Sequence, residues 1–168
     1  MKKNIQKLLP FLLLAMAFNS CKKDSYKSIG DPVSTLSSLA GTWKLSKVTQ
    51  TDEDALRKGF PYKTLDLTTT FAYTDFVLTL NVSGGAPTTF TTTPGNSPKI
   101  IRLANGNWKV DDPKYPKVLT LTNATDTAKI TLGSYPVGAN TNLAISVSRN
   151  DASTGKLLVS YSYVFTKQ

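Results

Sequence analysis

Apolar residues alternate with more polar ones along most of the chain after Leu39. The segment 76–82 is apolar at every even position, and the segment 156–166 carries aromatic residues at 161, 163 and 165. Because successive side chains of a β-strand point to opposite faces of the sheet, this period of two predicts strands with one apolar face. Threonine is abundant, and its β-branched side chain also favours strands.

Turn residues separate these segments. The pair Asn105-Gly106 predicts a tight hairpin, because both residues tolerate a positive φ. Asp54 is the predicted cap of a short helix over 55–58, which Gly59 ends. The predicted strands, about eight to ten of them, cover 42–51, 65–73, 76–82, 88–93, 100–103, 107–110, 118–122, 129–132, 143–149 and 156–166.

Consecutive strands joined by short turns, with almost no helix between them, predict an all-β fold. We expect an antiparallel up-and-down meander that closes into a barrel of about eight strands, because closure removes the unpaired edges. Such a barrel encloses either a core of side chains or one small ligand. A β-sandwich is the alternative.

The segment before this meander has the layout of a signal peptide. Lys2, Lys3 and Lys7 precede an apolar run over 8–18, and Cys21, the only cysteine of the chain, follows. The run is shorter than the roughly 20 residues that a membrane-spanning helix needs, so a retained transmembrane helix is the weaker alternative. We therefore expect a signal peptide over 1–20, a flexible tether rich in Ser, Lys and Asp over 21–38, and one domain over 39–168.

The residues around Cys21 resemble a bacterial lipobox. Ser20 is the small residue that such a motif has before its cysteine, whereas Phe18 and Asn19 depart from the commoner pattern. This loosened motif, followed by a charged run, is similar to lipoproteins of Bacteroidetes-type bacteria. The resemblance implies lipid attachment at Cys21, with fatty acyl chains such as palmitate, and an outer-membrane protein on either face of that membrane. An unmodified, buried cysteine is the alternative.

Two further motifs resemble lipocalins and related calycins. Gly41-Thr42-Trp43 opens the first strand with Gly-x-Trp, the closing 161–167 resembles the end of lipocalin-like domains of Bacteroidetes lipoproteins, and 106–110 fits a mid-barrel strand. The resemblance implies a lipocalin-like barrel in which Trp43 plugs the closed end. A ligand-stacking role for Trp43 is the alternative, and the direction of Trp108 stays open.

The charge is moderately positive. The chain has 20 basic and 11 acidic residues, and removing Lys2, Lys3 and Lys7 leaves 17 basic residues and a charge of 17 − 11 = +6. These residues are scattered instead of clustered, so we expect no nucleic-acid binding.

Few side chains offer chemistry. The chain has no histidine, the commonest general base and metal ligand. The acidic runs 52–54 and 111–112 are alternatives for calcium binding or glycan chemistry, but adjacent acids at turns more often cap them. We therefore expect no enzyme, metal site or cofactor. Asp126-Thr127-Ala128 resembles the O-glycosylation motif of Bacteroidetes periplasmic proteins, which predicts a glycan on Thr127.

Two functions follow as hypotheses. In the first, a membrane-anchored, monomeric lipocalin-like protein holds a small apolar or amphipathic ligand in its barrel. In the second, the barrel is filled and carries loops, over 94–98 and 133–140, that contact another envelope protein or a glycan. The sequence leaves the ligand-binding residues unknown.

Overall fold

The computed structural model describes residues 34–137 and 140–168. The predicted signal peptide and lipidation site, Cys21, lie outside the described residues. The elements, in chain order, are α2 (Thr35–Leu39), β1 (Gly41–Asp52), α3 (Glu53–Arg57), β2 (Thr64–Asp66), the 3-10 helix η1 (Tyr73–Asp75), β3 (Val77–Ser83), β4 (Ala86–Thr93), β5 (Asn105–Val110), β6 (Val118–Thr122), β7 (Thr127–Ser134), β8 (Asn142–Asn150) and β9 (Leu157–Lys167).

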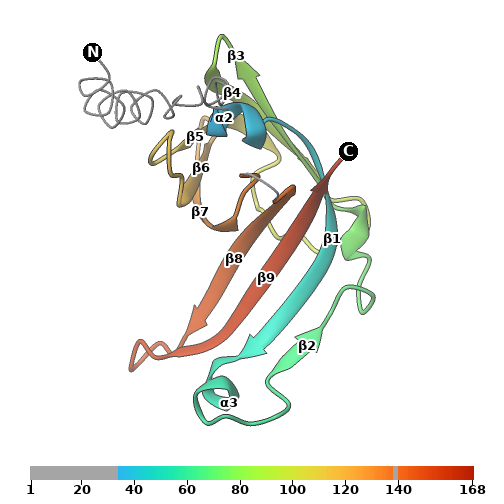
Figure 1. Ribbon diagram of the computed structural model, residues 1–168, viewed down its shortest axis with the longest axis vertical. Helices are drawn as coiled ribbons and strands as arrows, with labels where there is room; N and C mark the ends of the chain where they lie inside the picture. Colours follow the sequence, from blue (N-terminus) through green and yellow to red (C-terminus); the bar gives the residue numbers. More distant parts are fainter. Residues whose placement is uncertain (1–33, 138–139) are drawn as a thin grey trace, which may run out of the picture. The chain divides into compact units, whose positions relative to one another are not determined.

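The strands form one antiparallel sheet that closes on itself (Figure 1). From β3 to β9 each strand pairs with the next one in the chain, and β1 joins β3 to β9. The result is an eight-stranded closed barrel with β2 as an extra strand on β1. The predicted all-β up-and-down barrel is thus confirmed.

The interior of the barrel is filled by side chains from the inward-facing positions. Even positions of β3 point inward, as the alternation predicted. Burying one large apolar side chain stabilises a fold by about 1.5–3 kcal/mol, so this cluster is the main stabilising feature of the domain. The largest fully buried side chains are Trp43, Phe76, Phe90, Phe165, Leu39, Leu45, Leu78, Leu80, Leu119, Leu121, Leu143 and Ile145.

Helix α2 and Trp43 pack together at the start of the barrel. The indole Nε1 of Trp43, which is fully buried, donates a hydrogen bond to the carbonyl oxygen of Leu39 at 2.8 Å. Leu36 and Leu39 lie three positions apart on the helix and both belong to the core. Ser34 caps the helix. The folded domain therefore includes 35–38, which lie within the segment expected to be the tether.

Asn105 and Gly106 do not form the predicted hairpin, because both lie inside β5. Gly106 has a φ of +150°, and a Cβ there would overlap the carbonyl oxygen of Thr122 on β6. The glycine is needed for the close approach of two strands, and not for a turn.

Three other local predictions also need correction. The strand expected over 65–73 is only β2, because the Asp66 carboxylate accepts a hydrogen bond from the Thr68 amide at 2.9 Å and turns the chain. The segment 100–103 forms no strand, although Ile101 and Leu103 pack in the core. Helix α3 begins at Glu53, and its cap is Asp52 instead of Asp54.

Strand β1 extends beyond the barrel. Its first part, 41–44, pairs with β3, whereas 49–51 pair with the short β2. On its other side β1 pairs with β9 as far as Asp52, and β8 accompanies β9 to Asn150. The far halves of β8, β9 and β1, with β2, form an extension of the sheet, seen in the lower half of Figure 1. Helix α3 lies at its tip.

Candidate ligand-binding site

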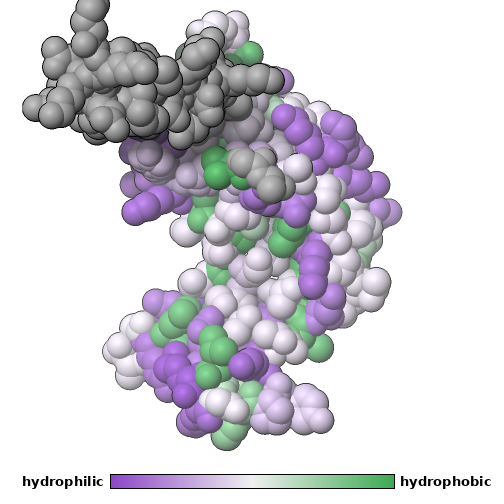
Figure 2. Space-filling model, in the orientation of Figure 1, coloured by the Kyte–Doolittle hydropathy of each residue, from purple (hydrophilic) through white to green (hydrophobic). Residues whose placement is uncertain are grey.

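The wall of the barrel opens between β7 and β8. These strands pair only at Thr131 with Ser146, Leu132 with Ile145, and Ser134 with Ala144. By contrast, β8 and β9 pair along their whole length. Within the described pairings, 127–130 and 147–150 therefore have no partner across this gap. Figure 2 shows the domain hollowed on this side, at the left of the view.

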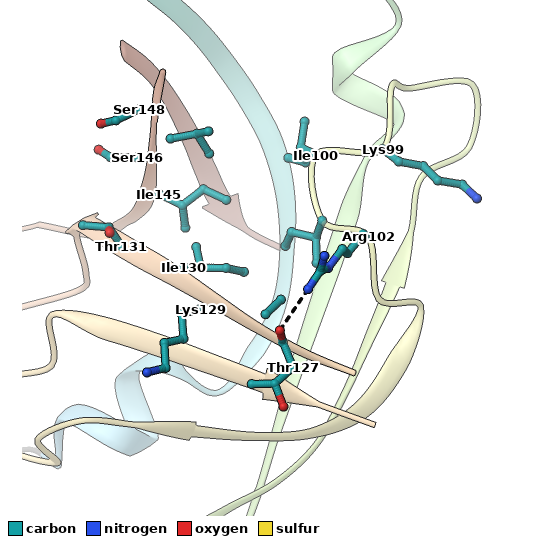
Figure 3. A pocket seen from close by; sticks show the side chains of 13 residues that line it. Lys99, Ile100, Arg102, Thr127, Lys129, Ile130, Thr131, Ile145, Ser146 and Ser148 are labelled. Carbon is teal, nitrogen blue, oxygen red and sulfur yellow. Dashed lines mark hydrogen bonds between the residues drawn. The ribbon is translucent and has the colours of Figure 1, made fainter. Parts of the chain in front are cut away.

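A cavity of about 450 Å³ occupies the gap. Consecutive residues of both strands border it, so its walls are strand edges and not only strand faces. Ile130 and Ile145 lie side by side at its centre, and the segment 99–102 covers one side (Figure 3). The apolar lining consists of Ile100, Ile101, Ala128, Ile130, Ile145 and Val147. The volume falls in the range of small-ligand sites, roughly 300–1,000 Å³.

The polar part of the lining carries hydroxyl groups and positive charge. Thr127, Thr131, Ser146 and Ser148 supply the hydroxyls. Lys99, Arg102 and Lys129 supply three basic side chains, and no Asp or Glu lines the cavity. An apolar centre with a basic border suits an amphipathic molecule better than a purely apolar one.

Arg102 fastens the covering segment to the edge of β7. Its Nη2 donates hydrogen bonds to Oδ1 of Asp126 at 2.9 Å and to the carbonyl oxygen of Thr127 at 3.0 Å. The dashed line in Figure 3 marks the second of these. The Thr127 amide in turn donates to Asp126 Oδ1 at 2.7 Å. These contacts satisfy polar groups at the end of an open strand edge, and open edges otherwise offer unpaired groups to other chains.

The inner face of the extension continues from this cavity. Directly opposite residues of antiparallel strands have side chains on the same face, so the register defines rows across the sheet. One row runs from Val147 through Tyr161 and Gln50 to Leu65. The row nearer the core contains Ile145 opposite Tyr163, both buried.

The next row, nearer the tip, is polar at both ends. It runs from Arg149 on β8 through Val159 to Asp52 on β1. Across the three rows the inner face thus changes from buried and apolar to exposed and charged. This gradient makes the whole surface amphipathic.

Four aromatic rings form a continuous series on this side. Phe71 contacts Tyr73 edge-to-face with ring centroids 5.7 Å apart, and Tyr73 contacts Tyr163 at 6.1 Å. Tyr161 stacks on Tyr163 at 6.3 Å. Tyr73 and Tyr163 are buried, whereas Phe71 is 54% exposed, so the series runs between the core and the surface.

The two buried phenol groups of this series, those of Tyr73 and Tyr163, have raised pKa values. Burial is the main cause that raises the pKa of Tyr163 to about 12, and the neighbouring Tyr73 and Tyr161 add to the effect. Burial also raises the pKa of Tyr73. Neutral phenols donate hydrogen bonds, so Tyr73 and Tyr163 offer donors and no negative charge.

Residues 18–166 match the model of a family described as a domain of unknown function (DUF5004). The chain belongs to this family. No curated protein matches it. Within the part of this DUF5004 protein that the structure describes, no helix has the length and apolar character needed to cross a membrane.

Of the site residues predicted from the sequence, only Thr127 lies in the described part of the DUF5004 domain. It is the first residue of β7, it is exposed, and it borders the cavity. Its glycosylation stays a prediction. Trp108, whose direction was open, is 3% exposed and donates from Nε1 to the Asn81 carbonyl oxygen at 2.7 Å. It therefore packs in the core.

The carboxylates of the two acidic runs of the DUF5004 domain accept hydrogen bonds from backbone amides and form ion pairs with basic side chains. Asp52 Oδ1 accepts hydrogen bonds from the amides of Asp54 and Ala55, both at 2.9 Å. The Asp54 carboxylate forms ion pairs with Lys58 at 2.6 Å and Lys156 at 2.8 Å. In the second run, Asp111 accepts from the amides of Lys117 and Val118, and Asp112 from those of Lys114 and Tyr115. No group of three potential metal ligands occurs among the described residues.

The sequence did not identify the residues of the cavity, such as Val147, or those of the adjoining inner face, such as Tyr161. Val147 and Tyr161 were recognised only as members of alternating strands. Their role depends on β8 and β9 continuing where β7 turns away, which is a property of the register. The one local signal was the unusual density of tyrosine in β9.

Proposed function

We propose that this DUF5004 protein is a lipocalin-like lipoprotein, anchored through Cys21, that binds a small amphipathic molecule. The ligand lies in the cavity between β7 and β8 and on the adjoining inner face, and not at the centre of the barrel. The observation that carries the proposal is the 450 Å³ cavity with isoleucine side chains at its centre and basic residues at its border.

The filled barrel interior supports this location. Trp43, Phe90 and Phe165 are fully buried in the barrel. Side chains therefore fill the space that a ligand would need at its centre. The gap between β7 and β8 is a place where residues next to the apolar interior border a cavity in the wall. A ligand there covers the partly exposed apolar surface of Ile100, Ala128 and Val147, which stabilises the complex by about 25 cal/mol per Å² of apolar area.

The binding test uses displacement of N-phenyl-1-naphthylamine, a neutral apolar dye that fluoresces in apolar surroundings. We expect the purified protein to raise the fluorescence of the dye, and alkyl amphiphiles to displace it. Val147→Trp places a bulky ring in the cavity and is expected to weaken dye binding about tenfold. Leu158, which is 40% exposed on β9, is the control, and Leu158→Trp is expected to leave dye binding unchanged.

Circular dichroism of both variants checks that the barrel is intact. Equal dye binding by wild type, Val147→Trp and Leu158→Trp would mean that the dye binds elsewhere, and would contradict the proposed site. The anchor is tested separately: intact mass of the membrane-extracted protein is expected to show acyl chains, and Cys21→Ser is expected to lack them and to leave the membrane fraction.

The filled barrel also supports the second hypothesis, a scaffold whose loops contact an envelope partner or a glycan. Tyr62 is 94% exposed and Tyr115 is 60% exposed, and both lie in loops. Exposed tyrosines are typical of contact surfaces. Crosslinking in native membranes tests this: recovery of one envelope partner that Tyr62→Ser abolishes, without any ligand in the cavity, would favour the scaffold.

A further inference from the structure

The inner face brings hydrogen-bond donors together beside the cavity. Arg149 lies one row beyond Val147 on the same face of β8, and Val147 is directly opposite Tyr161. Diagonal neighbours across antiparallel strands are within reach of long side chains. The rings of Tyr161, Tyr163 and Tyr73 follow in sequence, with centroids 6.3 and 6.1 Å apart. The charge of Arg149 also acts on the Tyr163 phenol, whose pKa it lowers against the larger effect of burial.

Arg149 has no acidic partner among the described residues. The ion pairs there join Arg57, Lys58 and Lys156 to Asp54, and Arg102 to Asp126. The acid on the same row as Arg149 is Asp52, whose Oδ1 accepts two amide hydrogen bonds from the first turn of α3. The N–H donors of the Arg149 guanidinium group are therefore available to an acceptor on a ligand.

We propose that the ligand of this site carries an anionic head group, a carboxylate or a phosphate, which Arg149 and the phenol of Tyr161 bind while the apolar chain lies in the cavity. The inference rests on the proposed function and names its ligand class. Arginine holds such groups through paired N–H donors, and a tyrosine hydroxyl adds another donor.

The charge around the cavity agrees with this ligand class. Lys99, Arg102 and Lys129 line the cavity without any acidic residue. Only Arg102 among these three forms an ion pair in the described part of the chain. A concave, partly apolar wall with one sign of charge raises the local concentration of ligands with the opposite sign. A neutral or cationic amphiphile gains nothing from this arrangement.

The experiment compares three amphiphiles of equal chain length, dodecanoate, dodecyl phosphate and dodecanol, as competitors of N-phenyl-1-naphthylamine. We expect wild-type protein to bind at least one anionic amphiphile about tenfold more tightly than dodecanol. Arg149→Gln is expected to remove this preference and to leave the affinity for dodecanol unchanged. Lys109→Gln, which removes an exposed positive charge from β5, is the matched control and is expected to keep the preference.

Tyr161→Phe provides a second variant, because it removes one hydroxyl and keeps the ring. We expect it to weaken binding of the preferred anion about threefold, again without effect on dodecanol. The anion that binds more tightly distinguishes a free fatty acid from a phosphate-bearing lipid. Equal affinity of wild type for the anions and dodecanol would overturn the inference while the proposed function stands. An anion preference that Arg149→Gln and Lys109→Gln reduce equally would also overturn the inference. Failure of all three amphiphiles to displace the dye from wild-type protein would overturn the proposed function itself.

Discussion

The two sides of this barrel use the same alternating pattern with different results. On the side of β3 to β6, inward residues such as Leu80 and Leu121 meet opposing strands and are fully buried. On the side of β8, β9 and β1, the strands continue past their neighbours, so the inward positions of Tyr161 and Leu65 stay partly or largely exposed. A difference in strand length, and not in residue type, therefore converts a core face into a solvent-exposed inner face.

Truncating matched leucines is the strongest test of this comparison. Leu80 is fully buried in the barrel, whereas Leu65 is 56% exposed on the inner face. We expect Leu80→Ala to lower the free energy of unfolding by about 2–5 kcal/mol, because it removes buried contacts and leaves a cavity. Leu65→Ala is expected to lower it by less than about 1 kcal/mol. Urea denaturation of the two variants measures both values.

Circular dichroism before denaturation confirms that each variant starts from the native fold. A cost for Leu65→Ala as large as that for Leu80→Ala would show that the inner face is covered in solution. The comparison between a filled and an open side would then be wrong.

The boundary between the two sides has a titration signature. Burial raises the pKa of Tyr163 from 10.0 to about 12. Between these values the unfolded chain loses this proton and the native protein keeps it, so stability falls as pH rises from about 10 to about 12. At full effect the loss is about 2–3 kcal/mol. Tyr163→Phe is expected to lack this part of the alkaline loss.

The measurement is urea denaturation of wild type and Tyr163→Phe at pH 9 and pH 11.5. Both proteins keep every other titratable group, so the difference between them reports Tyr163 together with its coupling to Tyr73 and Tyr161. If the difference in stability between the two proteins does not change with pH, Tyr163 is not at the buried edge of the site.

Much of the barrel was predictable, because its strands obey the period of two that burial of one face imposes. The segments β3, β6 and β9 are examples. The failures have local causes. Gly106 next to Asn105 has the pattern of a turn. In the structure a glycine is required there because the Thr122 backbone lies too close for a Cβ, and no sequence pattern predicts such a contact. The apolar residues at 100–103 looked like a strand, yet they cover the barrel without a ladder partner.

The candidate site was less accessible to prediction. Positive charge is scattered along the sequence, and only the register places Arg149 beside Tyr161 and Val147. The mismatch between β7 and β8 arises because β7 pairs with β8 only from Thr131 onward, although 127–134 read as one regular strand. The strand pairing thus determines which residues meet at the site, and that pairing depends on the whole sheet.

The smallest expected effect concerns the contact that fastens the covering segment to the open side. Arg102 and Asp126 are 65% and 42% exposed, so their ion pair adds less than about 1 kcal/mol to global stability. We expect Arg102→Gln to change the unfolding free energy by no more than this, yet to speed amide hydrogen exchange in 99–103 and at Thr127, because the segment loses its bonds to β7. Exchange in β3 and β4 is expected to stay as in wild type. Faster exchange in both regions would show that Arg102 supports the whole barrel, whereas unchanged exchange in both would show that other contacts hold the segment over the gap.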